Sequence, residues 1–455
     1  MIFRRILAVA SQTVKQAVRS RALSSLTLLL IAVLLSIPFL IRGDGTLAGR
    51  LQIVIEYSLA AAMTLLSVTT LWAAAGTVAT EIEERPLFLV LSKPVSRLEL
   101  WAGKWMAIVG LDAILLALTG GIVAAMVFHI VHSAPPGSPE RESVVRDLLT
   151  AREATSPDLS TLTRAPAAEA EEAAADETTD EEDAPAAAPA APDRHAILAA
   201  CTVAPNRSLS LVFAPRALAP AAGLSLAFKF ASSRPERVPV LCAWTFTGAD
   251  GRTTVIATTN TPGLRYTLPV PSPAIVDGKL NVTFSNLGGR IPSTVVFDPT
   301  AGGLELLVPQ GGFLGNLSKG LMIALLRLSL IAAIGVSAGC LLSVPVAVFL
   351  SLFVLILLAS SGYVQHVSAT GVFYVPHEGP MPEQGLPDRL TLRLFEAINA
   401  VTAPLLDLDG LPLLERGRWI GGALVGQAAK VLLLYTAVVA AVGVLLFQRR
   451  EIGRA

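Results

Sequence analysis

Charge is scarce in this sequence. Asp, Glu, Lys and Arg together make up 15% of its 455 residues, whereas they make up roughly 25% of an ordinary soluble domain. The 35 acidic and 35 basic residues cancel, so no surplus of positive charge is present to bind a nucleic-acid backbone. Three cysteines are too few for a disulfide scaffold or a Cys₄ metal site. These shortages exclude a soluble enzyme and a nucleic-acid binder that works through a basic surface.

Signatures of catalysis are also missing. The sequence contains no G-x-x-x-x-G-K-[ST] loop to hold phosphates and no H-E-x-x-H pair to hold a catalytic metal. His129 and His132 are three residues apart, but a metal site needs further protein ligands, and none is evident beside them. We therefore expect no enzyme, no metal site and no cofactor on this chain.

Long apolar runs are what the sequence has in excess. The nine apolar residue types reach 53% of the chain, and a helix needs about 20 such residues to cross a bilayer. Six runs have about this length or more: Leu23–Ile41, Leu51–Thr80, Trp105–Val131, Leu321–Cys340, Val344–Gly362 and Trp419–Phe447. The sequence therefore predicts six transmembrane helices.

A basic amphipathic segment precedes the first run. When residues 1–22 are placed on a helix, apolar side chains share one side, and Arg4, Arg5, Lys15 and Arg19 share the other. Such a helix lies in the headgroup layer of a bilayer with its cations on lipid phosphates. We predict an interfacial helix that contacts the lipid bilayer.

One carboxylate lies inside a predicted span. Asp112 falls within the third apolar run, and ionisable residues at that depth usually face the interior of a helix bundle. Two interpretations are open. Asp112 either belongs to a functional site or is hydrogen-bonded to a neighbouring helix for structural reasons.

A long insert separates the third and fourth spans. Residues 132–195 are rich in Ala, Pro and Glu and cannot form a core, so they predict a disordered acidic linker. Residues 196–316 contain short alternating or β-branched runs separated by Gly, Pro and Asp-Gly signals, which is typical of a small all-β sandwich. The insert is therefore predicted to end in a β domain.

The predicted fold class is mainly α: a polytopic membrane protein with six transmembrane helices, plus an inserted extracytoplasmic all-β domain. Its predicted parts are the interfacial helix 1–22, transmembrane helices 1–3 in 23–131, the linker 132–195, the β-sandwich-like domain 196–316, transmembrane helices 4–5 in 317–362, an outer loop with a re-entrant or interfacial helix in 363–418, and transmembrane helix 6 with a basic tail in 419–455.

The positive-inside rule gives the orientation. Basic residues cluster at both ends of the chain, so both termini are expected in the cytoplasm, in a multi-pass protein of a bacterial inner membrane. The β domain then lies outside. Its Cys201 and Cys242 are candidates for a disulfide in an oxidising periplasm, provided that their Cα atoms come within about 7 Å.

Residues 81–104, between the second and third spans, carry a distinctive local pattern. Ser96 and Glu99 form a capping box, and Pro94 disfavours helix at the residue before it, so a helix is expected from Ser96 through Lys104. A Leu-rich stretch lies upstream without lipid to cover it, which suits docking into a groove of a partner. The charged residues that end the second span are Glu81, Glu83, Glu84 and Arg85.

This pattern resembles the hallmark of ABC-2 type permeases, in the branch that includes permeases for copper-enzyme maturation. The matching features are the acidic run, the Leu-rich stretch, Lys-Pro-Val-Ser-Arg at 93–97, Glu99 and Gly103-Lys104. In that family the segment forms coupling helices that sit in a cleft of the ATPase subunit. The resemblance implies ATPase coupling for Glu81, Glu83, Glu84, Arg85, Leu87, Leu89, Lys93, Pro94, Ser96, Arg97, Glu99 and Lys104.

The resemblance also implies partners. ATP and Mg would bind to a separate nucleotide-binding subunit, and this chain would form a homodimer or pair with a related permease. The large insert departs from most such permeases, which have a short connection there. Three functions stay open: export by a permease, transmission of force to the β domain and a periplasmic partner, and a membrane-anchored periplasmic binding protein without an ATPase.

Overall fold

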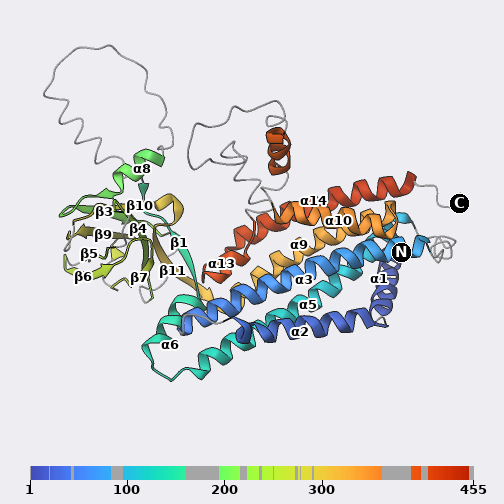
Figure 1. Ribbon diagram of the computed structural model, residues 1–455, viewed down its shortest axis with the longest axis horizontal. Helices are drawn as coiled ribbons and strands as arrows, with labels where there is room; N and C mark the ends of the chain where they lie inside the picture. The colour runs from blue at the N-terminus through green and yellow to red at the C-terminus, as the bar shows by residue number, and fades with distance from the viewer. Residues whose placement is uncertain are drawn as a thin grey trace, which may run out of the picture. The chain divides into compact units, whose positions relative to one another are not determined.

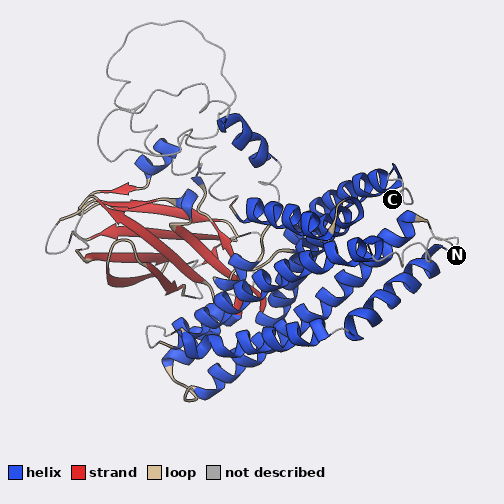
Figure 2. Ribbon diagram, turned by 45° about the vertical axis from the view of Figure 1, so that its right-hand side comes forward, coloured by secondary structure: helices blue, strands red, loops and turns tan. Residues whose placement is uncertain are grey.

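The computed structural model (Figure 1) forms two compact units, each of which is described by itself. Unit 1 comprises Met1–Leu149 and Gly312–Ala455, and unit 2 comprises Thr150–Gly311. The structure describes residues 2–19, 21–41, 46–83, 96–159, 194–215, 223–234, 238–248, 251–271, 275–276, 278–288, 292–360, 391–400 and 408–449. The strands are confined to unit 2 (Figure 2).

Unit 1 is a bundle of long helices. They are α1 (Ile2–Arg19), α2 (Arg21–Leu40), α3 (Leu47–Glu83), α5 (Arg97–Ser133), α9 (Phe313–Leu341), α10 (Val344–Ala359) and α14 (Gly422–Arg449), with the short α6 (Pro139–Val144), π-helix η1 (Val145–Leu149) and α13 (Leu411–Glu415). A further helix covers 391–400.

Five helices in the described part of the chain, α2, α3, α5, α9 and α14, are long and apolar enough to cross a membrane. The predicted fifth span corresponds to α10, whose 16 residues extend about 24 Å, short of the roughly 30 Å of a hydrocarbon core. The part of that predicted span beyond residue 360 lies outside the described residues.

Helix α9 forms the centre of the bundle, and small residues let its neighbours approach closely. A Cβ on Gly339 would lie 2.3 Å from the Ala75 carbonyl oxygen of α3, and one on Gly443 of α14 would lie 2.3 Å from Ser337 Oγ. Between apolar helices in lipid, close packing replaces the hydrophobic effect as the force of association. Glycine is therefore required at both contacts.

Two tryptophans join α5 to the same central helix. Trp101 Nε1 donates to Ser337 Oγ at 3.2 Å, and Trp105 Nε1 donates to the Ser329 carbonyl at 2.9 Å. Large apolar side chains remain exposed on the outer helices, including Phe39, Phe349 and Phe353. Exposed apolar side chains of this size suit a surface that faces lipid.

Helix α1 runs crosswise to the bundle at the end where α14 also finishes (Figure 1). Ala10 and Thr13 face the bundle, while Ile2, Phe3 and Val18 are more than 60% exposed. A helix with an exposed apolar face and basic residues is suited to a membrane surface. We call this end of unit 1 the α1 end, and the opposite end, which carries α6 and α13, the α6 end.

The α6 end is closed by segments that the sequence assigned to the linker and to the outer loop. Ser138 caps α6 through its side chain, Val144 is buried in the apolar core, and Glu140 accepts from the Leu47 backbone at 2.6 Å. Asn316 of α9 donates to the Arg418 carbonyl at 2.6 Å. The linker prediction therefore began too early, because a few apolar contacts suffice to order residues 134–149.

Unit 2 is a sandwich of two antiparallel sheets. One has the order β1-β11-β4-β10-β2 with β7 beside β4, and the other has the order β3-β9-β5-β6 with β8 beside β9. The strands are β1 (Thr150–Thr155), β2 (Thr202–Val203), β3 (Ser208–Phe213), β4 (Ser225–Ser232), β5 (Val240–Thr247), β6 (Thr253–Asn260), β7 (Arg265–Pro269), β8 (Ile275–Val276), β9 (Lys279–Asn286), β10 (Val295–Phe297) and β11 (Leu304–Gly312). Helix α8 (Arg194–Ala200) precedes β2.

An aromatic cluster fills the space between the two sheets. Trp244 of β5 is fully buried and packs against Phe228 of β4 and Phe284 of β9, with ring centroids 4.7 and 4.8 Å apart. Alternating inward side chains of this kind are the reason that the short runs in 196–316 form strands. The β-rich region is therefore as predicted, except that β1 adds a strand from the predicted linker.

The two cysteines of unit 2 are free thiols, so the candidate disulfide is not formed in the structure. Cys242 belongs to β5, whereas the Cys201 carbonyl accepts from Phe297 of β10 in the other sheet. Facing sheets pack about 10 Å apart, beyond the Cα separation that a disulfide tolerates. Burial raises the pKa of Cys201 to about 11 and that of Cys242 to about 12, which keeps both thiols protonated and unreactive at neutral pH.

We expect Cys201 and Cys242 to resist alkylation in the folded protein. Without any reductant, both should be alkylated after unfolding, and mass spectrometry should count one adduct on each. An intact mass that shows a linked pair in the unfolded, unreduced protein would contradict this assignment.

Replacing Gly339 with alanine should destabilise the bundle by about 1–3 kcal/mol, because the new Cβ overlaps the α3 backbone. Gly110→Ala is the matched control, since a Cβ there meets nothing within 4 Å. Thermal unfolding midpoints in detergent should fall for Gly339→Ala and hold or rise for Gly110→Ala. Equal midpoints for the two variants would contradict the close α3–α9 contact.

Candidate functional site

The candidate site is the place where α3 ends and α5 begins. We call it the junction and define it by Arg5, Glu81, Ser96, Glu99, Lys104 and Phe447. Six of the residues predicted to couple to an ATPase lie outside the described residues: Glu84, Arg85, Leu87, Leu89, Lys93 and Pro94. Glu83 is the last residue of α3. The geometry of the junction is therefore taken from the described ends of α3 and α5.

The start of α5 is fixed by the predicted capping box. Ser96 is extended, with φ −74° and ψ 155°, and its Oγ accepts from the Glu99 backbone N–H at 3.2 Å. In return, the Ser96 backbone N–H donates to Glu99 Oε2 at 2.7 Å. Two otherwise unpaired backbone donors are satisfied in this way. The prediction of a helix from residue 96 into the third span is confirmed.

A buried ion pair joins α5 to the end of α3. Lys104 Nζ lies 2.7 Å from Glu81 Oε1 and also donates to the Thr77 carbonyl at 3.0 Å. The Lys104 side chain is 1% exposed and that of Glu81 is 21% exposed. An ammonium ion removed from water needs such a counter-charge.

This burial limits what two of the predicted coupling residues can contact. Glu99 and Lys104, both assigned to ATPase coupling by the resemblance, are almost fully buried within this chain. Any part that they take in coupling is therefore to position the segment between α3 and α5. Ser96 is exposed and Arg97 is partly exposed, so these two retain access to a partner.

Helix α1 is attached to the junction from the side. Arg5 Nη1 lies 3.8 Å from Glu99 Oε1, and a Cβ on Gly103 would come within 2.6 Å of Val9. Arg5 therefore turns toward the bundle. The other three residues predicted at the membrane surface, Arg4, Lys15 and Arg19, are exposed. Sequence periodicity placed all four cations on one side of the helix and gave no signal for the Arg5 contact.

The end of α14 reaches the same place. Arg97 Nη1 donates to the Phe447 carbonyl, and its guanidinium carbon lies 5.1 Å from the centre of the Phe447 ring. Cation–π contacts of this kind add to the hydrogen bond. The junction thus connects α3 and α5 with α1 and with the end of α14, which comes from the other end of the chain.

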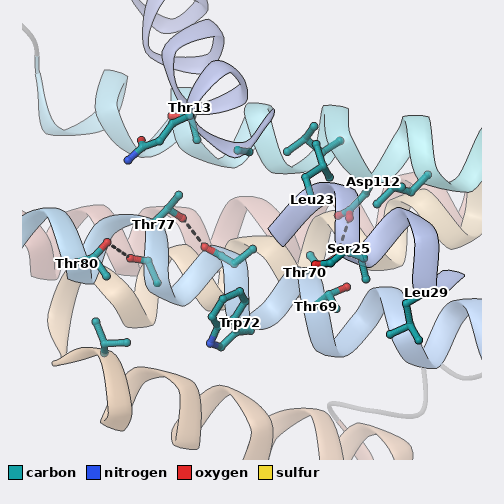
Figure 3. Close-up of a pocket in the computed structure, with 18 residues that line it drawn as sticks. Thr13, Leu23, Ser25, Leu29, Thr69, Thr70, Trp72, Thr77, Thr80 and Asp112 are labelled. Atoms are coloured by element: carbon teal, nitrogen blue, oxygen red, sulfur yellow. Dashed lines mark hydrogen bonds between the residues drawn. The ribbon is translucent and has the colours of Figure 1, made fainter. Parts of the chain in front are cut away.

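Asp112, the predicted intramembrane carboxylate, lies further along α5. It is 4% exposed, and its Oδ1 accepts from Thr70 Oγ1 of α3 at 2.8 Å. The predicted bond to a neighbouring helix is therefore present. Asp112 also lines a cavity of about 900 Å³, shown in Figure 3. Both interpretations of this residue thus remain open.

Comparison of the chain with family models, curated proteins and solved structures gave no match.

Replacing Glu81 with glutamine should destabilise the fold, because Lys104 then remains buried without a counter-charge. We expect a loss near the lower end of the about 3–5 kcal/mol typical of broken buried pairs, since Glu81 is partly exposed. The double variant Glu81→Gln/Lys104→Met should recover most of this loss in the thermal unfolding midpoint. Glu142→Gln, at an exposed position of α6, is the neutral control. Additive losses in the double variant would show that the two side chains do not interact.

Proposed function

We propose that this chain is the membrane subunit of an ABC-2 type transporter, and that a separate ATPase subunit docks on the segment between α3 and α5. ATP and Mg then belong to the ATPase, and two copies of this chain, or this chain and a related permease, form the membrane part. The observation that carries the proposal is the junction. Buried charges and a capping box hold both ends of a connecting segment whose residues match the family pattern.

The junction is suited to transmitting force. A push on the connecting segment reaches α5 through the capping box and α3 through the Glu81–Lys104 pair. Breaking a buried pair is costly, so the two helix ends move as one body. Arg5 and Arg97 pass the same displacement to α1 and to the end of α14. This arrangement fits a lever that converts movement of a partner into tilting of membrane helices.

Charge supports the proposed orientation. Exposed Arg4, Lys15 and Arg19 of α1 lie at the α1 end, where α14 finishes with Arg449 (Figure 1). Under the positive-inside rule this end faces the cytoplasm, where an ATPase has access to ATP. We therefore infer an inner-membrane protein with the junction and both termini inside and unit 2 outside.

A second candidate function is transmission of force to unit 2 without transport. The chain enters unit 2 through β1 and leaves it through β11, and these two strands are neighbours in one sheet. In the sequence, η1 directly precedes β1 and α9 directly follows β11. A relative shift of the helical segments on either side would therefore be delivered to two paired strands. In that case, unit 2 would act on a periplasmic partner.

Affinity purification of the full chain from membranes in mild detergent tests the main proposal. Mass spectrometry should identify an ABC-type ATPase in the wild-type preparation. The charge swap Glu84→Lys/Arg85→Glu should remove at least about 90% of it, because charge reversal across an interface opposes docking. The matched control is the swap Arg141→Glu/Glu142→Lys in α6, at the other end of unit 1, which should leave the ATPase bound.

Two results would contradict the proposal. One is that no ATPase accompanies the intact chain, which would favour an anchored binding protein. The other is that both charge swaps retain the ATPase equally, which would move the docking site away from the segment between α3 and α5. Equal expression and equal elution volumes of the two variants exclude misfolding as the cause of a loss.

A further inference from the structure

Unit 1 contains a cavity beside Asp112 that the proposed function does not use. It has a volume of about 900 Å³ and is lined by 18 residues from α1, α2, α3 and α5 with the first residue of α10. Figure 3 shows Thr69, Thr70, Trp72, Thr77 and Thr80 along α3, with Asp112 of α5 beside Thr70. The cavity therefore lies among these helices and extends to Thr77, whose carbonyl accepts from Lys104 of the junction.

The wall combines apolar side chains with hydrogen-bond acceptors. Leucines from α2 and α5 supply much of the apolar part. The hydroxyls of Thr13, Thr69, Thr77 and Thr80 each donate to a carbonyl of the preceding turn of their own helix. Their protons are used in these bonds, so toward a ligand they present oxygen lone pairs.

Asp112 makes the wall more strongly accepting. Its Oδ1 is satisfied by Thr70, whereas its Oδ2 is buried and has no hydrogen-bond partner. Asp112 is the single acidic or basic residue among the 18 lining residues, so no cation in the wall balances it. A buried, half-satisfied carboxylate is costly unless a donor or cation approaches it. A ligand that brings a positively charged N–H group would supply the missing donor and the counter-charge.

Trp72 supplies a second feature that favours a cation. It stands in the wall on the same helix as Thr70, and 57% of its surface is exposed. The face of an indole ring attracts ammonium groups, and more strongly where water is excluded. A ligand with an apolar body and an ammonium group matches the leucines, the hydroxyl oxygens and the carboxylate, and Trp72 adds an aromatic ring elsewhere in the wall.

We propose that this cavity is a binding site for lipophilic ammonium ions, whose N–H donates to the Asp112 carboxylate while the apolar body packs against the leucines of α2 and α5. Thr70 is a positioning residue, because its hydroxyl holds Oδ1 of that carboxylate. The site is complete within one chain and does not depend on an ATPase. If the chain is part of an exporter, this cavity is where a cargo of that class binds.

The test uses dansylcadaverine, which joins an aromatic body to a primary ammonium, and its N-acetyl derivative, which lacks the charge. The full chain is reconstituted alone in nanodiscs, and binding is followed by dansyl anisotropy after subtraction of empty nanodiscs. We expect saturable binding of the amine and at least about tenfold weaker binding of the acetylated probe, given the usual strength of hydrogen bonds to charged groups. Asp112→Asn should weaken amine binding by a similar factor while retaining the bond to Thr70.

A filled cavity gives an independent check that does not alter the charge. Gly76 lines the cavity, and a Cβ there meets nothing within 4 Å, so the side chain of Gly76→Leu should occupy the cavity and block the amine. Gly110→Leu is the matched control, because a Cβ on Gly110 also meets nothing within 4 Å and Gly110 does not line the cavity. This variant should bind the amine as the wild type does. Equal binding of the two probes to wild type, or unchanged amine binding by Gly76→Leu, would overturn the proposal. Because no ATPase is present, either result leaves the docking proposal unaffected.

Discussion

The arrangement of unit 1 depends on the need to neutralise a cation inside a helix bundle. Lys104 is almost fully buried on α5, and Glu81 at the end of α3 is its counter-charge. The pair fixes the ends of these two antiparallel helices against each other. Glu99, which is also buried, performs a related task at the same end, since it caps α5 and faces Arg5 of α1. The junction therefore holds the ends of α3, α5 and α1 in fixed positions.

The junction and the cavity are connected through the α3–α5 interface. Lys104 and Asp112 are eight residues apart on α5, about 12 Å along the helix, and both bond to α3. A shift of α5 against α3 would strain the Glu81–Lys104 pair and the Thr70–Asp112 hydrogen bond together. A movement imposed at the junction would therefore reach the carboxylate that we assign to ligand binding. This link requires no contact between the docking segment and the ligand.

The sequence predicted the parts that depend on local patterns. The capping box at Ser96, the helical ends around 81–104 and the strands of unit 2 follow from capping chemistry, apolar length and alternation. It did not predict contacts set by tertiary packing. The Arg5–Glu99 pair, the contact of Arg97 with Phe447 and the cavity beside Asp112 join residues that are far apart in the chain. Strand β1 was missed because its polar residues gain burial only beside β11.

The most direct test of the central claim is the side of the membrane on which the junction lies. Single cysteines are introduced at Lys93, in the proposed docking segment, and at Glu142, an exposed position of α6, and intact cells are treated with a membrane-impermeant maleimide. The account predicts that residue 142 reacts from outside, whereas residue 93 reacts only after permeabilisation. Reaction of residue 93 in intact cells would place the junction outside, beyond the reach of any cytoplasmic ATPase, and would contradict the account.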